Sequence, residues 1–350
     1  MMTGGPRRRK PPRQKDLTDR LLDEDQETDR LETHQRFNRK SKGAQQGKIE
    51  RTALLRAAEE METGEIERLP IGEVIQVYSL YCEVDHPTGQ RLCVVRKTLN
   101  KMSETSIIVG DRVRFRDTEV RDEIGRPEAV IEQVLPRQTV LTRADSFSGR
   151  QQQPIVANAQ QMLIVASYLR PRVKWGLVDR MIVAAQSGGL VPLVCLTKID
   201  LTEQDGELSL REAADVMAHY GHLGLATFQV GLDVTPDNDR LKAALKGKST
   251  VLAGHSGVGK STLISTIQPG LSIRIGDVSN YNDKGRHTTS SARRYVLDFG
   301  GQVIDTPGVK MFGLWQVTAE NLRGYFPDVE NGTAPPWRVE SFERIEASLQ

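Results

Sequence analysis

The sequence predicts an α/β fold built on a doubly wound parallel sheet, preceded by an all-β barrel and followed by a short α-helical C-terminal segment. Short runs rich in Val, Ile, Tyr and Phe alternate with turn residues between residues 71 and 142. From residue 143, apolar runs typical of buried parallel strands alternate with segments of helical spacing. The expected regions are a charged extension (1–70), the barrel (71–142), the α/β domain (143–324) and the C-terminal segment (325–350).

Composition excludes several classes of protein. The 350 residues carry a net charge of only +2, which excludes a histone-like polycation. No apolar run approaches the roughly 20 residues of a membrane helix, and no apolar stretch follows the basic N-terminus as in a secretory signal. The three cysteines, Cys82, Cys93 and Cys195, form no C-x-x-C pattern. We therefore expect no disulfide framework, no membrane association and a cytoplasmic location.

The first 70 residues are expected to be disordered, because too few of them are apolar to offset the entropy of ordering. Loose helical spacing indicates one short helix around residues 48–62. Residues 1–15 carry six positive charges and no negative ones. This basic tip is either a solubilising tail or a nucleic-acid-binding arm.

The barrel is expected to be an OB-fold, with strands at 72–77, 81–84, 91–96, 112–116 and 129–134. Such barrels often bind nucleic acid across one face. Candidate contacts are Arg96, Lys97 and Lys101, with Tyr78 and Tyr81 as stacking residues. The alternative is that both tyrosines belong to the core, as tyrosines in strands more often do. Basic and acidic residues also nearly balance in this segment, which disfavours a nucleic-acid-binding face.

A phosphate-binding loop follows the expected strand at 250–253 and precedes a helical run that begins at Thr262. Its glycines let backbone N–H groups turn toward a phosphate, and the helix N-terminus adds partial positive charge. The lysine would reach the β- and γ-phosphates, and the serine would hold Mg²⁺. The loop matches G-x-x-x-x-G-K-[ST] in full: Gly254, His255, Ser256, Gly257, Val258, Gly259, Lys260 and Ser261. These residues and Thr262 are expected to bind the nucleotide.

A second motif selects the base. The tetrapeptide Thr197-Lys198-Ile199-Asp200 stands at the end of a buried apolar strand. A carboxylate there accepts hydrogen bonds from N1 and N2 of guanine, a donor pair that adenine lacks. The motif therefore favours GTP and GDP as ligands and disfavours a P-loop ATPase.

Two further segments complete a switch apparatus. Asp305 directly follows the strand at 302–304 and can hold the Mg²⁺ water shell, and Gly308 can offer its N–H to a γ-phosphate. The polar segment Gly285–Thr289 can close over the nucleotide, with either Thr288 or Thr289 as an Mg²⁺ ligand.

The order of these motifs differs from that of Ras-like GTPases, because Asp200 precedes Lys260 and Asp305. The same sheet can form if the old termini are joined and new ones opened elsewhere. We therefore predict a circularly permuted P-loop GTPase domain.

These motifs, in this order after an OB-fold, resemble the RsgA (YjeQ) family of GTPases that depend on the small ribosomal subunit. The resemblance runs from about residue 71 to the end of the chain. It implies GTP hydrolysis stimulated by the 30S subunit, a role in its late maturation, ribosomal RNA as a contact, and a protein that acts as a monomer. The alternative is a nucleotide-regulated RNA-binding module whose hydrolysis is incidental.

The chain departs from the family in two places. The family's zinc-binding Cys/His cluster has no counterpart, since Val329 stands where its first cysteine is expected and no histidine follows His287. We therefore expect no zinc ligands of the family type; a pair at His219 and His222 lacks further ligands. The family's Ser-Ala pair at the guanine is replaced by Gly231 and Leu232, which predicts lower nucleotide affinity.

Hydrolysis must use a different water-orienting group from that of Ras. The residue after Gly308 is Val309, where Ras-like enzymes carry glutamine. The resemblance offers His287 instead, whose neutral ring could accept from water; otherwise His287 packs or contacts RNA. The expected catalytic residues are therefore His287, Lys260 and Gly308.

Overall fold

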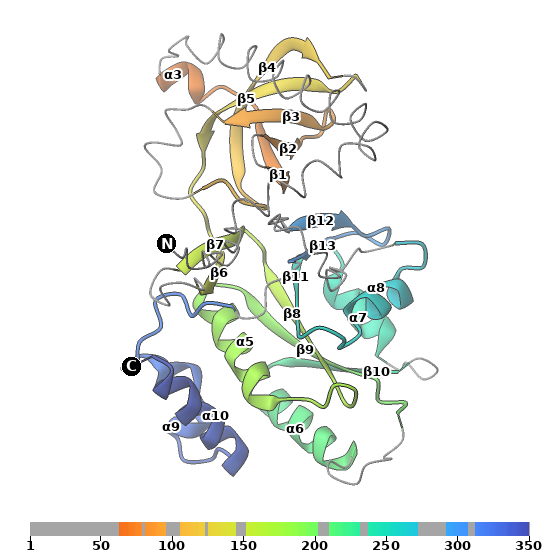
Figure 1. Cartoon of the computed structure of the whole chain (residues 1–350), viewed down its shortest axis with the longest axis vertical. Coiled ribbons are helices and arrows are strands. Elements are labelled where there is room, and N and C mark those ends of the chain that lie inside the picture. Colours follow the sequence, from red (N-terminus) through yellow and green to blue (C-terminus); the bar gives the residue numbers. More distant parts are fainter. Residues whose placement is uncertain are drawn as a thin grey trace, which may run out of the picture. The chain divides into compact units, whose positions relative to one another are not determined.

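The computed structural model of the chain describes residues 63–78, 81–95, 106–122, 125–144, 152–201, 210–231, 237–271, 292–306 and 312–349 (Figure 1). Residues Glu60–Gln350 form one compact unit. The helix expected around residues 48–62 lies outside the described residues. The described chain begins with the short helix α3 (Thr63–Ile66).

The barrel forms as predicted. Its strands are β1 (Ile71–Val77), β2 (Cys82–Asp85), β3 (Arg91–Val95), β4 (Arg112–Arg121) and β5 (Pro127–Val134). They follow the order β1-β2-β3-β5-β4, and pairing of β1 with β4 closes the sheet on itself. Alternate side chains such as Val74, Val84, Phe115 and Ile131 fill the interior. This OB-like architecture confirms the all-β prediction.

A hairpin that the sequence analysis did not anticipate follows the barrel. It pairs β6 (Val140–Ala144) with β7 (Gln152–Ala157). The expected domain boundary at residues 142 and 143 falls inside β6. The hairpin escaped notice because its strands include polar residues such as Gln152 and Gln153 and show no long apolar run.

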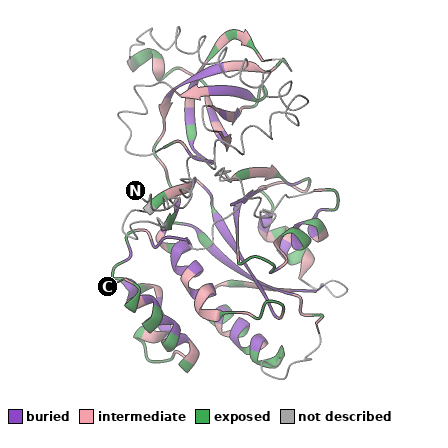
Figure 2. Ribbon diagram, viewed as in Figure 1, coloured by how far each residue is buried: buried purple, intermediate pink, exposed green. Residues whose placement is uncertain are grey.

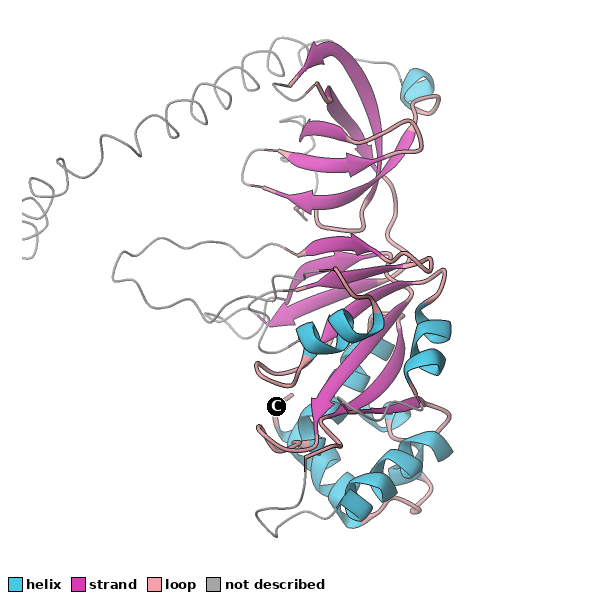
Figure 3. Cartoon of the chain, turned by 90° about the vertical axis from the view of Figure 1, so that its right-hand side faces the viewer, coloured by secondary structure: helices cyan, strands magenta, loops and turns pink. Residues whose placement is uncertain are grey.

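The α/β domain contains the doubly wound sheet that the sequence predicts. Its strand order is β10-β9-β8-β11-β13-β12, in which neighbours are parallel except for the β13–β12 pair. One hydrophobic cluster packs α5 and α6 on one face, and another packs α7 and α8 on the other (Figure 3). The strands are β8 (Gln161–Ser167), β9 (Val191–Thr197), β10 (Ala226–Val230), β11 (Ser249–Ala253), β12 (Arg293–Val296) and β13 (Gln302–Asp305). The helices are α5 (Trp175–Ser187), α6 (Leu210–His222), α7 (Asn238–Leu245) and α8 (Lys260–Ile267).

The central strands of this sheet are buried throughout, as their continuous apolar sequences require. Every residue of β8 and of β11 is buried (Figure 2). Strand β12 also pairs with β1 of the barrel, through Gln76 and Arg293. The barrel strands and the α/β strands therefore belong to one hydrogen-bonded sheet.

The C-terminal segment packs against the face of the sheet that carries α5 and α6. It consists of η1 (Leu322–Tyr325), α9 (Pro327–Glu330) and α10 (Pro336–Ala347). Phe326, Phe342 and Ile345 join the same hydrophobic cluster as α5 (Figure 1). No helix in the described part of the chain is long and apolar enough to span a membrane.

Candidate nucleotide site

The phosphate-binding loop lies between β11 and α8, where the sequence places it. Gly254, Gly257 and Gly259 have φ values of +143°, +80° and +91°, which favour glycine. A Cβ on Gly254 would lie 2.2 Å from the carbonyl oxygen of Val165. The loop therefore needs glycine to lie this close to β8, and helix α8 begins directly after it at Lys260.

Lys260 lies folded over the loop. Its Nζ donates hydrogen bonds to the carbonyl oxygens of Gly254 (2.8 Å) and His255 (3.1 Å). Burial lowers the pKa of Lys260, and the negative charge of Asp305 opposes that shift. The ammonium group is thus held at the loop, next to the carboxylate that ends β13.

Asp305 is only 2% exposed. Burial raises the pKa of this carboxyl to about 6, against the lowering effects of Lys260 and the N–H of Thr306. Its Oδ2 is buried and has no hydrogen-bond partner. A hard cation with its water shell would satisfy this oxygen, and the hydroxyl of Ser261 is a ligand of the same class. The residues present therefore fit Mg²⁺.

The guanine motif has divided roles. The Thr197 hydroxyl donates to the Val258 carbonyl at 2.6 Å, and Lys198, at φ +61°, donates from Nζ to the Gly257 carbonyl at 2.8 Å. Both side chains thus brace the phosphate-binding loop. Ile199 packs against the hydrophobic cluster of α5 and α6, whereas Asp200 lines an open cavity.

This cavity, of about 310 Å³, joins the base-selecting motif to the phosphate-binding loop. The residues that line it are Arg170, Thr197, Lys198, Asp200, Leu201, Val230, Gly231, Gly259, Thr262, Leu263 and Thr266. They come from the carboxyl ends of β8, β9 and β10 and from one face of α8. Ligands of doubly wound sheets bind at this end of the strands.

Gly231 is close to Asp200. A Cβ on Gly231 would lie 2.8 Å from Asp200 Oδ1 and 3.2 Å from Asp200 Cβ. Glycine in place of the family's serine therefore leaves room for the carboxylate in its present position. Sequence reasoning also missed Arg170 as a lining residue, although its place just after β8 puts it at the binding edge of the sheet.

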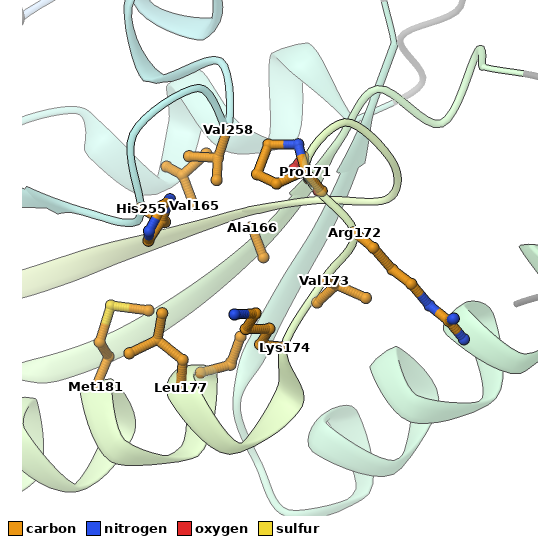
Figure 4. Close-up of a pocket in the computed structure, with 12 residues that line it drawn as sticks. Val165, Ala166, Pro171, Arg172, Val173, Lys174, Leu177, Met181, His255 and Val258 are labelled. Atoms are coloured by element: carbon orange, nitrogen blue, oxygen red, sulfur yellow. Dashed lines mark hydrogen bonds between the residues drawn. The ribbon is translucent and has the colours of Figure 1, made fainter. Parts of the chain in front are cut away.

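The side chain of His255 lines a different cavity. This apolar hollow of about 90 Å³ lies between the phosphate-binding loop, the end of β8 and the start of α5, with His255 and Val258 on one side and Leu177 and Met181 on another (Figure 4). The Nδ1 atom of the His255 ring also forms a hydrogen bond of 3.0 Å with the carbonyl oxygen of Ser256. Any contact of His255 with the nucleotide is therefore expected from its backbone.

Several predicted residues lie outside the described residues. They are His287, Thr288, Thr289, Gly308 and Val309 of the two switch segments, and Arg96, Lys97 and Lys101 of the barrel. Their predicted roles stay predictions.

The stacking candidates of the barrel contact each other. The rings of Tyr78 and Tyr81 are stacked with centroids 4.4 Å apart. The Tyr78 hydroxyl donates to Glu83, and burial, reinforced by Glu83, raises the pKa of Tyr78 to about 12. Both tyrosines are partly exposed, so they could still offer a surface to a ring.

Within the described ranges, no three His, Cys, Asp or Glu side chains gather as a metal site. His219 instead pairs with Asp328, with 2.8 Å between Nε2 and Oδ2. The expected absence of a family-type zinc stays a prediction.

Comparison with known proteins gives one answer. The profile of the family "RsgA GTPase" matches residues 134–315. The small ribosomal subunit biogenesis GTPase RsgA of Haemophilus influenzae (strain 86-028NP) is 32% identical over 305 residues, covering 79% of this chain and 84% of that protein. The protein of the same name from Dickeya dadantii is 35% identical over 258 residues, covering 73% and 70%.

Solved structures agree. YjeQ from Thermotoga maritima aligns with a TM-score of 0.60 at 28% identity, over 80% of this chain and 98% of that one. YloQ, described as a circularly permuted GTPase, shares the fold with a TM-score of 0.57 at 20% identity, over 83% and 98%. The guanine motif on β9 precedes the phosphate-binding loop after β11 and Asp305 on β13, as the permuted order requires. The chain therefore belongs to the RsgA GTPase family and is a circularly permuted GTP-hydrolysing enzyme.

Proposed function

We propose that this GTPase acts on the small ribosomal subunit in its late maturation, and that the subunit stimulates its turnover. The observation that carries the proposal is similarity over both the barrel and the GTPase domain to proteins named small ribosomal subunit biogenesis GTPases. A protein that acts on the small ribosomal subunit is expected in the cytoplasm. We propose that it acts there as a monomer.

The nucleotide residues take these roles. The loop amides and Lys260 hold the phosphates, Asp200 accepts from guanine, and Ser261 and Asp305 would hold Mg²⁺ with Thr288 or Thr289. Bound Mg²⁺ neutralises charge on the phosphate oxygens. His287 orients the attacking water, and Gly308 offers its N–H to the γ-phosphate.

The barrel is the proposed contact with ribosomal RNA. It pairs through β1 with β12, and β12 begins shortly after the predicted first switch. Four of the seven described arginines between residues 71 and 142 are held in ion pairs, such as Arg91 with Asp117 and Arg137 with Asp111. The RNA contact is therefore expected from stacking at Tyr78 and Tyr81, from exposed arginines such as Arg112 and Arg121, and from cations outside the described residues.

The test is GTP turnover by the full chain alone, with small subunits and with large subunits. We expect slow turnover alone and strong stimulation by small subunits only. His287→Ala should bind GTP normally and lose the stimulation. Turnover that small subunits leave unchanged would favour a nucleotide-regulated RNA-binding module, and equal competition by ATP would contradict the role of Asp200.

A further inference from the structure

The hairpin of β6 and β7 contacts both the barrel and the chain that follows the predicted second switch, the segment around Asp305 and Gly308. Its two strands form a sheet of their own, apart from the large sheet (Figure 1). None of the nucleotide motifs lies on it, so the proposed roles of those motifs do not explain it. Its contacts on each side indicate what it does in the reaction cycle.

On the barrel side, the hairpin holds the loop that precedes β4. Val109 of this loop forms a parallel bridge with Val156 of β7, and its carbonyl oxygen accepts a hydrogen bond of 2.9 Å from the N–H of Ala157. The buried side chain of Val109 belongs to the hydrophobic cluster of α5 and α6, whereas Val113, four residues later, belongs to the barrel core. One residue of the barrel segment is therefore built into the core of the α/β domain.

The fit between this loop and the hairpin depends on particular residues. Gly110 has a φ of +89°, and a Cβ on it would lie 1.9 Å from the carbonyl oxygen of Ala157, so the approach requires glycine. Asn158 has a φ of +54°, a region that asparagine adopts more readily than most residues. Its Nδ2 donates to the carbonyl of Gly110 at 2.8 Å, and its Oδ1 accepts from the N–H of Gln138 at 2.8 Å.

The same loop is hydrogen-bonded to the barrel itself. The N–H of Gly110 donates to the carbonyl of Val74 at 2.8 Å, and the N–H of Val74 donates to the carbonyl of Asp111 at 2.9 Å. Val74 lies on β1, and its side chain is fully buried in the barrel core. A shift of the hairpin would therefore reach β1 through one loop that is bonded on both sides.

On the nucleotide side, the hairpin holds the chain that follows the second switch. The N–H of Gly313 donates to the carbonyl of Thr142 on β6 at 2.8 Å, and Phe312 forms an antiparallel bridge with Arg143. Phe312 is only 4% exposed and belongs to the cluster of α5 and α6. It follows Gly308, the predicted γ-phosphate contact, by four residues, so β6 pairs with the chain directly after the switch.

We propose that the hairpin of β6 and β7 is a relay that carries the state of the nucleotide from the end of the second switch to the barrel. Packed cores and bonded strands change between discrete arrangements, so a small shift of Phe312 and Gly313 against β6 moves the hairpin as a unit. The proposal rests on the predicted contact of Gly308 with the γ-phosphate. By linkage, a partner bound to the barrel then changes the affinity for GTP by the same factor as GTP changes the affinity for that partner.

The test is amide hydrogen exchange of the full chain with GDP and with a non-hydrolysable GTP analogue, without ribosomal subunits. We expect residues 312–314 and barrel residues 107–111 both to exchange about fivefold more slowly with the analogue. Asn158→Gly permits the positive φ and removes both side-chain hydrogen bonds, and Gly110→Ala forces the loop away from Ala157. Each variant should keep the change at residues 312–314 and lose it at residues 107–111.

Gly125→Ala is the matched control for Gly110→Ala. Gly125 lies in a turn of the barrel with a φ of +83°, but a Cβ on it would meet nothing within 4 Å. The variant has a similar backbone strain without the clash, so both nucleotide-dependent changes should remain. Neither Gly110 nor Asn158 belongs to the nucleotide site, so GTP turnover without subunits should be unchanged in all three variants.

Three results would overturn the relay. If residues 312–314 respond to the analogue in wild type and residues 107–111 do not, the hairpin does not pass the change on. If Asn158→Gly and Gly110→Ala keep the response at residues 107–111, the barrel senses the nucleotide by another route, such as β12. If residues 312–314 show no response, the predicted contact of Gly308 does not reach the hairpin. Because subunits are absent, these failures are distinct from a failure of the proposed role on the small subunit.

Discussion

The barrel and the C-terminal helices are attached to the GTPase domain in two different ways. The barrel is attached through strands: β1 pairs with β12, and Arg294 of β12 forms ion pairs with Glu73 (3.0 Å) and Asp85 of the barrel. The C-terminal helices are attached through a buried arginine: Arg338 of α10 pairs with Asp179 of α5 and with Asp328 of α9 (3.2 Å).

The two attachments contact different parts of the GTPase domain. Strand β12 pairs with β13, which ends in Asp305, so the barrel is hydrogen-bonded through β12 to the strand that carries a proposed Mg²⁺ ligand. Asp179 and Arg338 lie within the cluster of α5, α6 and α10, and neither lines the nucleotide cavity. We infer that the barrel attachment serves coupling to the nucleotide, whereas the C-terminal attachment serves stability.

The largest expected loss of stability comes from breaking the C-terminal attachment. Arg338→Met leaves the carboxylate of Asp179 buried without its cation and that of Asp328 with His219 as its remaining partner, and removal of one partner of a buried pair typically costs about 3–5 kcal/mol of unfolding free energy. Chemical denaturation would measure this loss, and nucleotide affinity of the folded protein should not change. Arg344→Met, on the same helix but with an exposed pair to Glu340, should cost less than about 1 kcal/mol. Similar costs for both variants would contradict the assignment.

The next effect concerns Asp305, at the end of the strand beside β12. Its folded pKa of about 6 lies above its ordinary value of 3.8. The folded protein without nucleotide therefore binds more protons than the unfolded chain, and its stability falls as pH rises between those two values. The full penalty above pH 6 is about 3 kcal/mol.

Asp305→Asn should remove this penalty. We expect the variant without nucleotide to be about 2–3 kcal/mol more stable than wild type at pH 7, and to lose Mg²⁺-dependent nucleotide affinity. Denaturation at pH 4.5 and 7, with and without Mg²⁺ and GDP, measures both. Asp298→Asn, in the exposed turn between β12 and β13, is the control. A destabilised Asp305→Asn at pH 7 would show that the carboxylate supports the fold.

The sequence predicted the nucleotide side of the molecule better than either attachment. Gly254 to Ser261 form a contiguous motif between a strand and a helix, so spacing alone located them. The pair of Arg338 with Asp179 joins residues 159 positions apart, and no local pattern signals such a contact. The sheet shared by β12 and β1 escaped prediction for the same reason.

Even within the motifs, sequence gave position but not role. The spacing of Thr197-Lys198-Ile199-Asp200 identified a base selector, yet only Asp200 of these four lines the cavity without also bracing the phosphate-binding loop or packing into the core. Arg170 lacked any motif. Its place at the carboxyl end of a parallel strand was the available signal.

Breaking the attachment of the barrel should lower the free energy of unfolding only slightly and should reduce the stimulation by small subunits more strongly. The Arg294 side chain is 7% exposed, but its partners Glu73 and Asp85 are 33% and 39% exposed. Arg294→Gln should therefore cost only about 1 kcal/mol. Basal GTP turnover should be unchanged, while stimulation by small subunits falls several-fold because the barrel is no longer held to β12.

Two controls qualify the Arg294 result. Arg294→Lys keeps the charge and should recover part of the stimulation. Arg240→Gln removes the ion pair between the exposed Arg240 of α7 and Asp237. Helix α7 follows β10, at the other end of the α/β strands from β12, so this variant should leave stimulation intact. If Arg294→Gln keeps full stimulation, or loses basal turnover as well, the barrel attachment does not transmit the nucleotide state.

The smallest expected effect comes from adding one methyl group, either beside the nucleotide site or on the helical side of the molecule. Gly231→Ala places a Cβ 2.8 Å from Asp200 Oδ1, so the carboxylate must shift and guanine affinity should fall by a few-fold, about 1 kcal/mol. Gly221 is exposed near the end of α6, and a Cβ added there meets nothing within 4 Å. Gly221→Ala should raise stability by up to about 1 kcal/mol through helix propensity and leave affinity unchanged. Denaturation and GDP titration of both variants test the contrast. A loss of affinity in Gly221→Ala would mean that the helical side also supports the nucleotide site, and the two attachments would not be functionally separate.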